Sequence, residues 1–381
     1  MSEIGCPSGA GGCDAAAMGS SGQLARAGHC DGYDAFGRGR FPVGVASIRA
    51  FDMARDRVFP CEIWYPAEPR HQGQDLAPDT SDRFTVPHQD RSRTQAAVRD
   101  AAPRPGNYAL ILYSHSSGGH RRSATFLSTH LASHGYVVAA LDHSERVAGE
   151  LAPQPGETAA QRAARVAAWI ANRVPDIRFL LDQMVTRRAW KTAAVVDPNR
   201  VGIVGHSFGG WTALATPDTE PRIGAVVALA PGGSSRPRPG IIAATLAFGW
   251  SRDVPTLYLA GDRDVFTPLP GIYELFDRTP ATRHMVILHR ADHQHFNDDV
   301  AYEHEVLRAM SFPPEAAWIQ QAIRPIAELC SAEHAHLTVR GLTLSHLDAA
   351  LRQQSEARRL LAGDIAALLA SLGVEVIQPR P

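Results

Sequence analysis

The sequence predicts a doubly wound α/β domain: a mostly parallel sheet with helices on both faces and a helical C-terminal extension. Apolar runs of strand length recur between residues 108 and 291, and helical patterns separate several of them. The runs are continuously apolar rather than alternating, which is typical of parallel strands buried on both faces. The chain has 381 residues, of which 44% are hydrophobic and 20% charged, so it can bury a core of this kind.

The first strands are expected shortly after Phe41. Residues 42–52 and 58–66 are rich in β-branched and aromatic side chains and are separated by the polar segment 53–57, which predicts a strand pair. Residues 1–38 are rich in glycine and lack hydrophobic periodicity, so we expect a flexible leader there. A single domain then covers residues 39–381.

A long excursion is predicted at residues 67–106, which are polar and interrupted by prolines. A loop of that length inside a compact domain is more often functional or mobile than inert.

The alternation that follows sets the fold class. Strands are predicted at 108–114, 136–142, 200–205, 223–230, 254–261 and 284–291, and helices at 121–135, 158–186 and 207–216. Within 158–186, Val174, Ile177, Leu181 and Met184 recur at helical spacing, so one face of this helix should pack on the sheet.

The tail is predicted to be helical at 315–330, 339–353 and 355–372. The charge on residues 347–359 suggests a solvated outer face. Residues 303–338 are a candidate helical insertion or lid. The apolar stretch 240–250 is expected to be either a pocket wall or small cap, or a plain amphipathic helix.

Charge and targeting signals exclude several classes of protein. There are 38 basic and 39 acidic side chains, a balance that argues against nucleic acid or anionic lipid as a partner. No apolar run approaches the roughly 20 residues needed to cross a bilayer, and the first residues do not resemble a secretory signal. Five cysteines without a CxxC pair suggest neither a disulfide framework nor a zinc knuckle. We therefore expect a cytoplasmic protein without a membrane span.

The candidate nucleophile is Ser207, in the sequence Gly205-His206-Ser207-Phe208-Gly209 between a predicted strand and a predicted helix. A serine on such a tight turn needs residues without side chains two positions to either side, and Gly205 and Gly209 supply them. The turn raises the hydroxyl above the sheet edge, beside a helix N-terminus that favours developing negative charge. The alternative is a glycine-rich turn with a capping serine.

A general base and its carboxylate partner are expected downstream. One predicted strand runs into Asp262 and Asp264, and the next runs into His293 and His295. The carboxyl ends of parallel strands gather on one edge of a sheet, so these groups and Ser207 should meet there. We assign His293 as base and Asp264 as its partner. Asp262 is the alternative acid or a turn residue, and His295 the alternative base, a wall residue or a surface histidine.

Two backbone amides should form the oxyanion hole. One is the N–H of Phe208, directly after the candidate nucleophile, and the other should come from the small-residue loop 115–120. We choose Ser117 as donor, with Ser116 as the near competitor. The alternative for this loop is a glycine-rich helix entry without a catalytic role.

These motifs resemble the α/β-hydrolase superfamily, and more narrowly its dienelactone-hydrolase-like esterases and platelet-activating-factor-acetylhydrolase-like lipases. The likeness runs from about Val43 to Ala350 and is carried by EIWYP, YSHSSGGHRR, LASHGYVVAALDH, IRFLLDQM, GHSFGG and DHQHF. It implies Ser207 as nucleophile, His293 as base, and the amides of Ser117 and Phe208 as oxyanion donors.

The sequence departs from these relatives in two places. Dienelactone hydrolases carry a cysteine where Ser207 stands, which puts lactone opening in doubt. The acetylhydrolase branch takes its acid from the loop that here spans 231–240, which has no carboxylate. Asp264 then becomes the acid, as in the bacterial polyester and cutinase-like relatives.

No metal or other cofactor is expected. Histidines cluster at 284, 289, 293 and 295 and at 115 and 120, and two of them could chelate, but no HExxH motif or carboxylate pattern completes a shell. Neither GxGxxG after a strand nor a P-loop occurs.

The expected function is a serine hydrolase that cleaves small to medium carboxylic esters by a Ser-His-Asp acyl-enzyme mechanism. The alternatives are an amidase or peptidase, a lipase or polyester hydrolase on the same residues, and a non-catalytic binding protein on a hydrolase fold. The expected partners are a small-molecule ester and, as a homodimer, a second copy of the chain.

Overall fold

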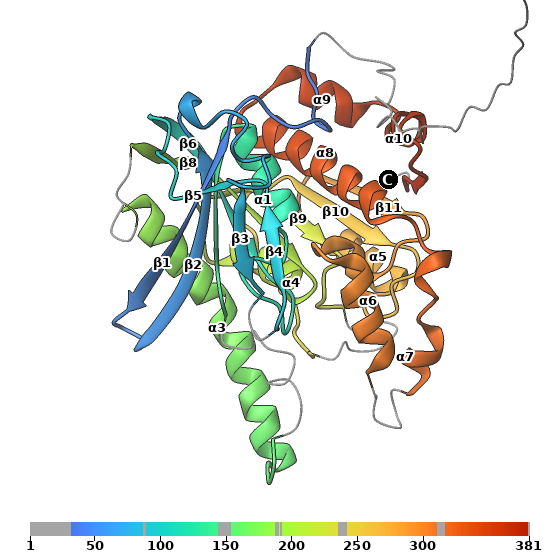
Figure 1. The fold of residues 1–381 in the computed structure, drawn as a ribbon. Coiled ribbons are helices and arrows are strands. Elements are labelled where there is room, and N and C mark those ends of the chain that lie inside the picture. Colours follow the sequence, from blue (N-terminus) through green and yellow to red (C-terminus); the bar gives the residue numbers. More distant parts are fainter. Residues whose placement is uncertain are drawn as a thin grey trace, which may run out of the picture.

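The computed structural model describes residues 32–379, except 87–88, 144–153, 187–189, 191–192, 235–241 and 311–316. A ten-stranded sheet with helices on both faces forms its centre (Figure 1), which confirms the predicted fold class. The strands of this sheet are β1 (Val43–Asp52), β2 (Arg57–Pro66), β5 (Val98–Arg99), β6 (Gly106–Ser114), β7 (Tyr136–Leu141), β8 (Ala194–His206), β9 (Ile223–Leu229), β10 (Thr256–Gly261), β11 (Arg283–Leu288) and β12 (Val376–Ile377).

The sheet order is β12-β11-β10-β9-β8-β6-β7-β2-β1-β5. The six consecutive strands from β11 to β7 are parallel to one another, whereas β12 and β2 at the two ends of this group pair antiparallel. The predicted strand pair is the antiparallel β1–β2, which joins the parallel core through β7. The carboxyl ends of the parallel strands therefore lie along one edge, as the sequence predicts.

The core has two halves because side chains of the central strands alternate between the faces. In β6, Leu110 and Leu112 point to one half, and Ala109 and Ile111 point to the other. The first half packs on α3 (Ala159–Val185), α4 (Phe208–Ala215) and α5 (Leu269–Arg278). The second packs on α1 (Thr125–Ser133), α8 (Ala332–Leu351), α9 (Ser355–Ala362) and α10 (Ile365–Ser371).

The predicted excursion 67–106 contains regular secondary structure and is not a loop throughout. It contains the short helix η1 (Pro69–His71), the antiparallel pair β3 (Asp82–Thr85) and β4 (Ser92–Gln95), and the edge strand β5. Arg99 in β5 forms ion pairs with Asp82, at 2.7 Å, and with the buried Glu62 of β2, at 2.9 Å. These contacts attach the excursion to the sheet.

The predicted leader is too long. Residues 32–38 pack against the body: the Tyr33 hydroxyl donates a hydrogen bond of 3.0 Å to Asp348 on α8, and Ala35 is buried. The sequence did not predict this packing of residues 32–38, because isolated aromatic and small residues make the contact and show no periodicity. Residues 1–31 lie outside the described residues.

The tail is helical, but its burial differs from the prediction. α8 begins at Ala332 rather than at residue 339, because the Ser331 hydroxyl caps it by accepting the N–H of His334. Leu347 and Asp348, predicted on a solvated face, are buried. Asp348 is there because it pairs with Arg352, at 3.1 Å, and accepts hydrogen bonds from two tyrosines.

The lid candidate 303–338 divides into several elements. It includes most of α6 (Val300–Ala309), then α7 (Ala317–Ala322), η5 (Ile326–Glu328) and the first turns of α8. Ala335 and Thr338 are buried, so the last residues of this range belong to the packed body. Any lid is confined to the residues before them.

The stretch predicted as a wall or a helix at 240–250 is not helical where it is described. From Ile242 to Trp250 it is irregular, and burial alternates with a period of two: Ala244, Leu246, Phe248 and Trp250 are buried. The Trp211 indole donates a 2.8 Å hydrogen bond to the Thr245 carbonyl, so this segment packs against α4. Among the described helices, none is long and apolar enough to cross a membrane.

Candidate active site

Ser207 lies on a sharp turn between β8 and α4. Its backbone has φ 59° and ψ −116°, a conformation that costs energy in a residue with a side chain. A Cβ on Gly205 would lie 2.0 Å from the Gly209 carbonyl oxygen, and one on Gly209 would lie 1.9 Å from the Ser114 carbonyl oxygen. Both glycines are therefore required by steric contact, and Ser207 is partly exposed between buried neighbours.

His293 and Asp264 meet at the same edge of the sheet. His293 begins the short helix η3 (His293–Phe296) after β11, and Asp264 follows β10. The His293 Nδ1–H donates a hydrogen bond of 2.7 Å to Asp264 Oδ2. Asp264 also accepts the N–H of Phe266, at 2.8 Å, and the N–H and hydroxyl of Thr267, at 2.9 and 2.6 Å. Four hydrogen bonds thus fix the carboxylate that orients the imidazole.

The imidazole of His293 lies beside the Ser207 turn. Its ring centroid is 4.7 Å from that of His206, the residue before Ser207, and 5.4 Å from that of Phe266. His206 is in turn held by a 3.2 Å hydrogen bond between its Nδ1 and the Asn297 side-chain oxygen. Because Nδ1 of His293 faces Asp264, Nε2 is the nitrogen left for a proton transfer.

Electrostatics suit this pair to a base with an ionised partner. Burial alone would lower the pKa of His293, but the charge and hydrogen bond of Asp264 outweigh it and raise the pKa above its ordinary value. Burial alone would raise the pKa of Asp264, but His293 and Thr267 lower it below its ordinary value. Asp264 is therefore a carboxylate at neutral pH.

The alternative residues are engaged elsewhere. Asp262 accepts a 2.8 Å hydrogen bond from His289 and a 2.7 Å bond from the N–H of Arg290. His295 contacts Asp292 at 2.7 Å and the Cys330 carbonyl at 3.0 Å. Burial would lower the pKa of His295, but the side chains of Asp292 and Cys330 raise it to about 10. Both ring nitrogens are engaged by these contacts and by the N–H of Asp292, at 3.0 Å, so neither is left for a base.

The two expected oxyanion donors come from adjoining segments. Phe208 is the first residue of α4, and Ser117 is partly exposed in the loop between β6 and α1. The close approach of Gly209 to the Ser114 carbonyl brings this loop against the turn that carries Ser207. A glycine-rich helix entry alone would not require that contact.

Sequence reasoning missed Arg173, a fully buried residue of α3. Its guanidinium contacts the loop after β6 and lies 4.3 Å from the centre of the Phe208 ring. The only sequence signal is a basic residue beside an apolar helical stripe, which is usually a solvated side chain.

A family model described as PET hydrolase-like matches residues 115–334, more than half of the chain. The chain belongs to this PET hydrolase-like family. The matched span contains Ser207, Asp264 and His293. It leaves out the predicted strand pair, the excursion and most of the helical tail.

Individual relatives agree with this family. The chain is 26% identical over 202 residues to a cutinase of Thermobifida alba, covering 52% of this chain and 57% of the cutinase. It is 24% identical over 217 residues to a platelet-activating factor acetylhydrolase of Cavia porcellus, covering 48% and 49%. The chain thus spans about half the length of the curated relatives it matches.

A solved structure shows the same fold. A ferulic acid esterase from Streptomyces cinnamoneus superposes with a TM-score of 0.64 at 22% identity, covering 90% of this chain and 97% of the esterase. Together with the family match, this confirms the predicted resemblance to the α/β-hydrolase superfamily.

Within the described part of this PET hydrolase-like chain, no group of three or more histidine, cysteine, aspartate or glutamate residues is arranged to hold a metal ion. Several of the histidines that cluster in the sequence are engaged by other partners. His115, for example, donates through Nδ1 to the Ser116 carbonyl at 2.7 Å, while its Nε2 accepts the N–H of His143 at 3.0 Å.

Proposed function

We propose that this protein hydrolyses carboxylic esters of small to medium size through an acyl-enzyme on Ser207. The observation that carries the proposal is the 2.7 Å hydrogen bond between His293 and Asp264 beside the strained turn of Ser207. Membership in the PET hydrolase-like family and the likeness to cutinases support it.

In the proposed mechanism, His293 Nε2 takes the proton of the Ser207 hydroxyl as its oxygen attacks the ester carbonyl. The amides of Ser117 and Phe208 stabilise the tetrahedral oxyanion. His293 then protonates the leaving alcohol, and a water molecule that it deprotonates clears the acyl group. Asp264 stays ionised throughout and stabilises the imidazolium.

Covalent labelling tests the nucleophile. A fluorophosphonate probe should add one mass to the wild-type protein and none to Ser207→Ala, whose kcat on a nitrophenyl ester should fall by several orders of magnitude. Ser116→Ala, in the neighbouring loop, is the matched control and should keep the label. Equal labelling of wild type and Ser207→Ala would refute the assignment.

A second candidate is hydrolysis of polyesters, which the family description and the cutinase relatives favour. A panel of nitrophenyl esters from acetate to palmitate, beside a polyester film and a hydroxycinnamate ester, separates the two. The small-ester proposal predicts the highest kcat/KM on short chains. Matched ester and anilide substrates test the amidase alternative.

We also propose, from the sequence, that the protein is cytoplasmic and forms a homodimer. Analytical ultracentrifugation of the purified chain tests the dimer, and cell fractionation tests the location.

A further inference from the structure

Arg173 connects the two segments that supply the proposed oxyanion donors. Its Nη1 donates to the His115 carbonyl at 2.6 Å and to the Ser114 hydroxyl at 3.2 Å, and its Nη2 reaches the Ser116 carbonyl at 3.4 Å. The same guanidinium lies over the Phe208 ring, 4.3 Å from its centre. The buried guanidinium of Arg173 therefore contacts both the loop after β6 and the Phe208 side chain.

Because the peptide group is planar, the contacts of Arg173 also set the direction of the Ser117 N–H. The Ser116 carbonyl and the Ser117 N–H belong to one planar peptide group, and in the trans form they point in opposite directions. The Ser116 oxygen accepts hydrogen bonds from Arg173, from His115 Nδ1 at 2.7 Å and from the N–H of Gly119 at 3.1 Å. Holding that oxygen inward aims the Ser117 N–H outward.

Arg173 is itself held by a buried hydrogen-bonded row of Ser114, His143 and Asp176. The Ser114 hydroxyl lies 3.2 Å from His143 Nε2, and His143 Nδ1 donates to Asp176 at 2.8 Å. Burial lowers the pKa of His143, so this imidazole is neutral and can accept the Ser114 hydroxyl proton while Ser114 accepts from Arg173. Asp176 also pairs with Arg55, at 2.7 Å, and with Arg57.

This row has the residue types of a serine-hydrolase site but cannot act as one. Ser114, His143 and Asp176 are each at most 1% exposed, and the serine hydroxyl is bonded to a guanidinium. The row lies behind the loop that carries Ser117. The row can instead support that loop, because Ser114 hydrogen-bonds Arg173 and Arg173 contacts the loop carbonyls.

We infer that Arg173 is a positioning residue that aims the oxyanion-hole amides of Ser117 and Phe208, held by the buried row Ser114–His143–Asp176. The inference rests on the proposed function. A lysine at this position would keep the charge but lose the fork, because one ammonium cannot reach the Ser114 hydroxyl and both carbonyls in the same geometry.

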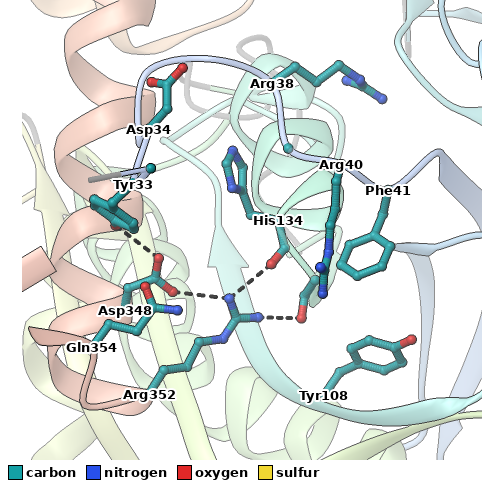
Figure 2. A pocket seen from close by; sticks show the side chains of 13 residues that line it. Tyr33, Asp34, Arg38, Arg40, Phe41, Tyr108, His134, Asp348, Arg352 and Gln354 are labelled. Carbon is teal, nitrogen blue, oxygen red and sulfur yellow. Dashed lines mark hydrogen bonds and ion pairs between the residues drawn. The ribbon is translucent and has the colours of Figure 1, made fainter. Parts of the chain in front are cut away.

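The test compares Arg173→Lys with Arg352→Lys. Arg352 makes the same kinds of contact near the amino end of β7: it donates to the carbonyls of His134 and Gly135 and pairs with Asp348 (Figure 2). Its guanidinium also lies 3.6 Å from the centre of the Tyr136 ring. Both variants should lose thermal stability, so the control reports what loss of a carbonyl-binding guanidinium costs away from the site, although the Arg352 side chain is 17% exposed whereas Arg173 is fully buried.

On a nitrophenyl ester, Arg173→Lys should lower kcat about 10- to 100-fold with little change in KM, since misaimed donors weaken only the transition state. The inhibition constant of a boronic acid, which forms a tetrahedral adduct on the serine, should rise by a similar factor. Arg352→Lys should change neither quantity by more than about twofold.

An unchanged kcat in Arg173→Lys, a change in KM alone, or an equal loss in Arg352→Lys would overturn the inference. If Arg173→Lys does not fold, Ser114→Ala removes one contact of the fork; a fall in kcat at constant KM supports the inference, and an unchanged kcat overturns it. Fluorophosphonate labelling of the wild type separates this outcome from failure of the proposed function, because an unlabelled wild type would refute Ser207 itself.

Discussion

At the scale of single residues, hydrogen bonds distinguish two aspartates, and two histidines, that lie only two positions apart in the chain. Asp264 holds His293, whereas Asp262 holds His289, although both carboxylates follow the same strand. His293 keeps one ring nitrogen free of the carboxylate, whereas both nitrogens of His295 are engaged. This difference supports His293, and not His295, as the proposed base.

The pH dependence of hydrolysis follows from the raised pKa of His293. A general base works in its deprotonated form, so kcat/KM should rise with pH through a midpoint above the ordinary histidine value of about 6.5. Asp264→Asn removes the charge that raises this pKa, so the midpoint should shift to lower pH and kcat should fall about 10⁴-fold. Rates on a nitrophenyl ester across neutral pH measure both, and a wild-type midpoint at or below the ordinary value would contradict the assignment.

The glycine at position 209 is a second test at this scale. Gly209→Ala would force a Cβ to 1.9 Å from the Ser114 carbonyl oxygen, and backbone on both sides must move. We expect a loss of about 3 kcal/mol or more in the free energy of unfolding, and a large loss of kcat because the loop and turn separate. Urea unfolding measures the first quantity.

The matched control is Gly363→Ala, where the nearest atom to the new Cβ lies at 3.4 Å. It should change stability by less than about 1 kcal/mol. Equal stability of the two variants would show that the close approach at Gly209 is not required.

At the scale of elements, burial depends on what each segment packs against. α8 carries Asp348 near its C-terminal end, yet it lies on the sheet, and its side chains form much of the second half of the core. The stretch from Ile242 to Trp250 has enough apolar residues for a helix, but it is irregular and packs against α4 with alternate residues buried. Local composition does not distinguish these outcomes, because both depend on partners distant in sequence.

Leu347 tests the role of α8. Leu347 is fully buried against the sheet near Gly202, so Leu347→Ala should cost about 2–5 kcal/mol in the free energy of unfolding through lost burial and a residual cavity. Glu333→Ala, on an exposed position of the same helix, should cost less than about 0.5 kcal/mol. A solvated α8 would instead give two equal, small effects in denaturant unfolding.

At the scale of the molecule, the sheet is stable only because helices from distant parts of the chain cover both faces. The second face is covered by α1 from the first half of the chain and by α8, α9 and α10 from its end (Figure 1). The edge of the sheet that carries the candidate site also contacts the tail, since the Cys330 carbonyl contacts His295 and the Cys330 N–H donates to the Arg290 carbonyl at 2.7 Å.

Removal of the tail should therefore unfold the protein. A chain that ends at residue 331 loses α8, α9 and α10 and exposes the apolar second face, so we expect no cooperative thermal transition and strong binding of a hydrophobic dye. A chain that ends at Val374 keeps α8, α9, α10 and the buried Val374, loses β12, which pairs two residues with β11, and should melt cooperatively. Cooperative melting of the shorter chain would contradict the two-sided core.

The order of strands and helices, the strained serine turn and the candidate residues at the strand ends could be predicted from local patterns. Strand and helix periodicity, and the glycines around Ser207, express constraints that act within a few residues. The choice between Asp262 and Asp264, the docking of Tyr33 on Asp348 and the burial of Arg173 depend on packing between segments up to some 300 residues apart. Because a buried charge is stable only where distant groups complete its hydrogen bonds, no local pattern could have revealed Arg173 or its place between the two amides.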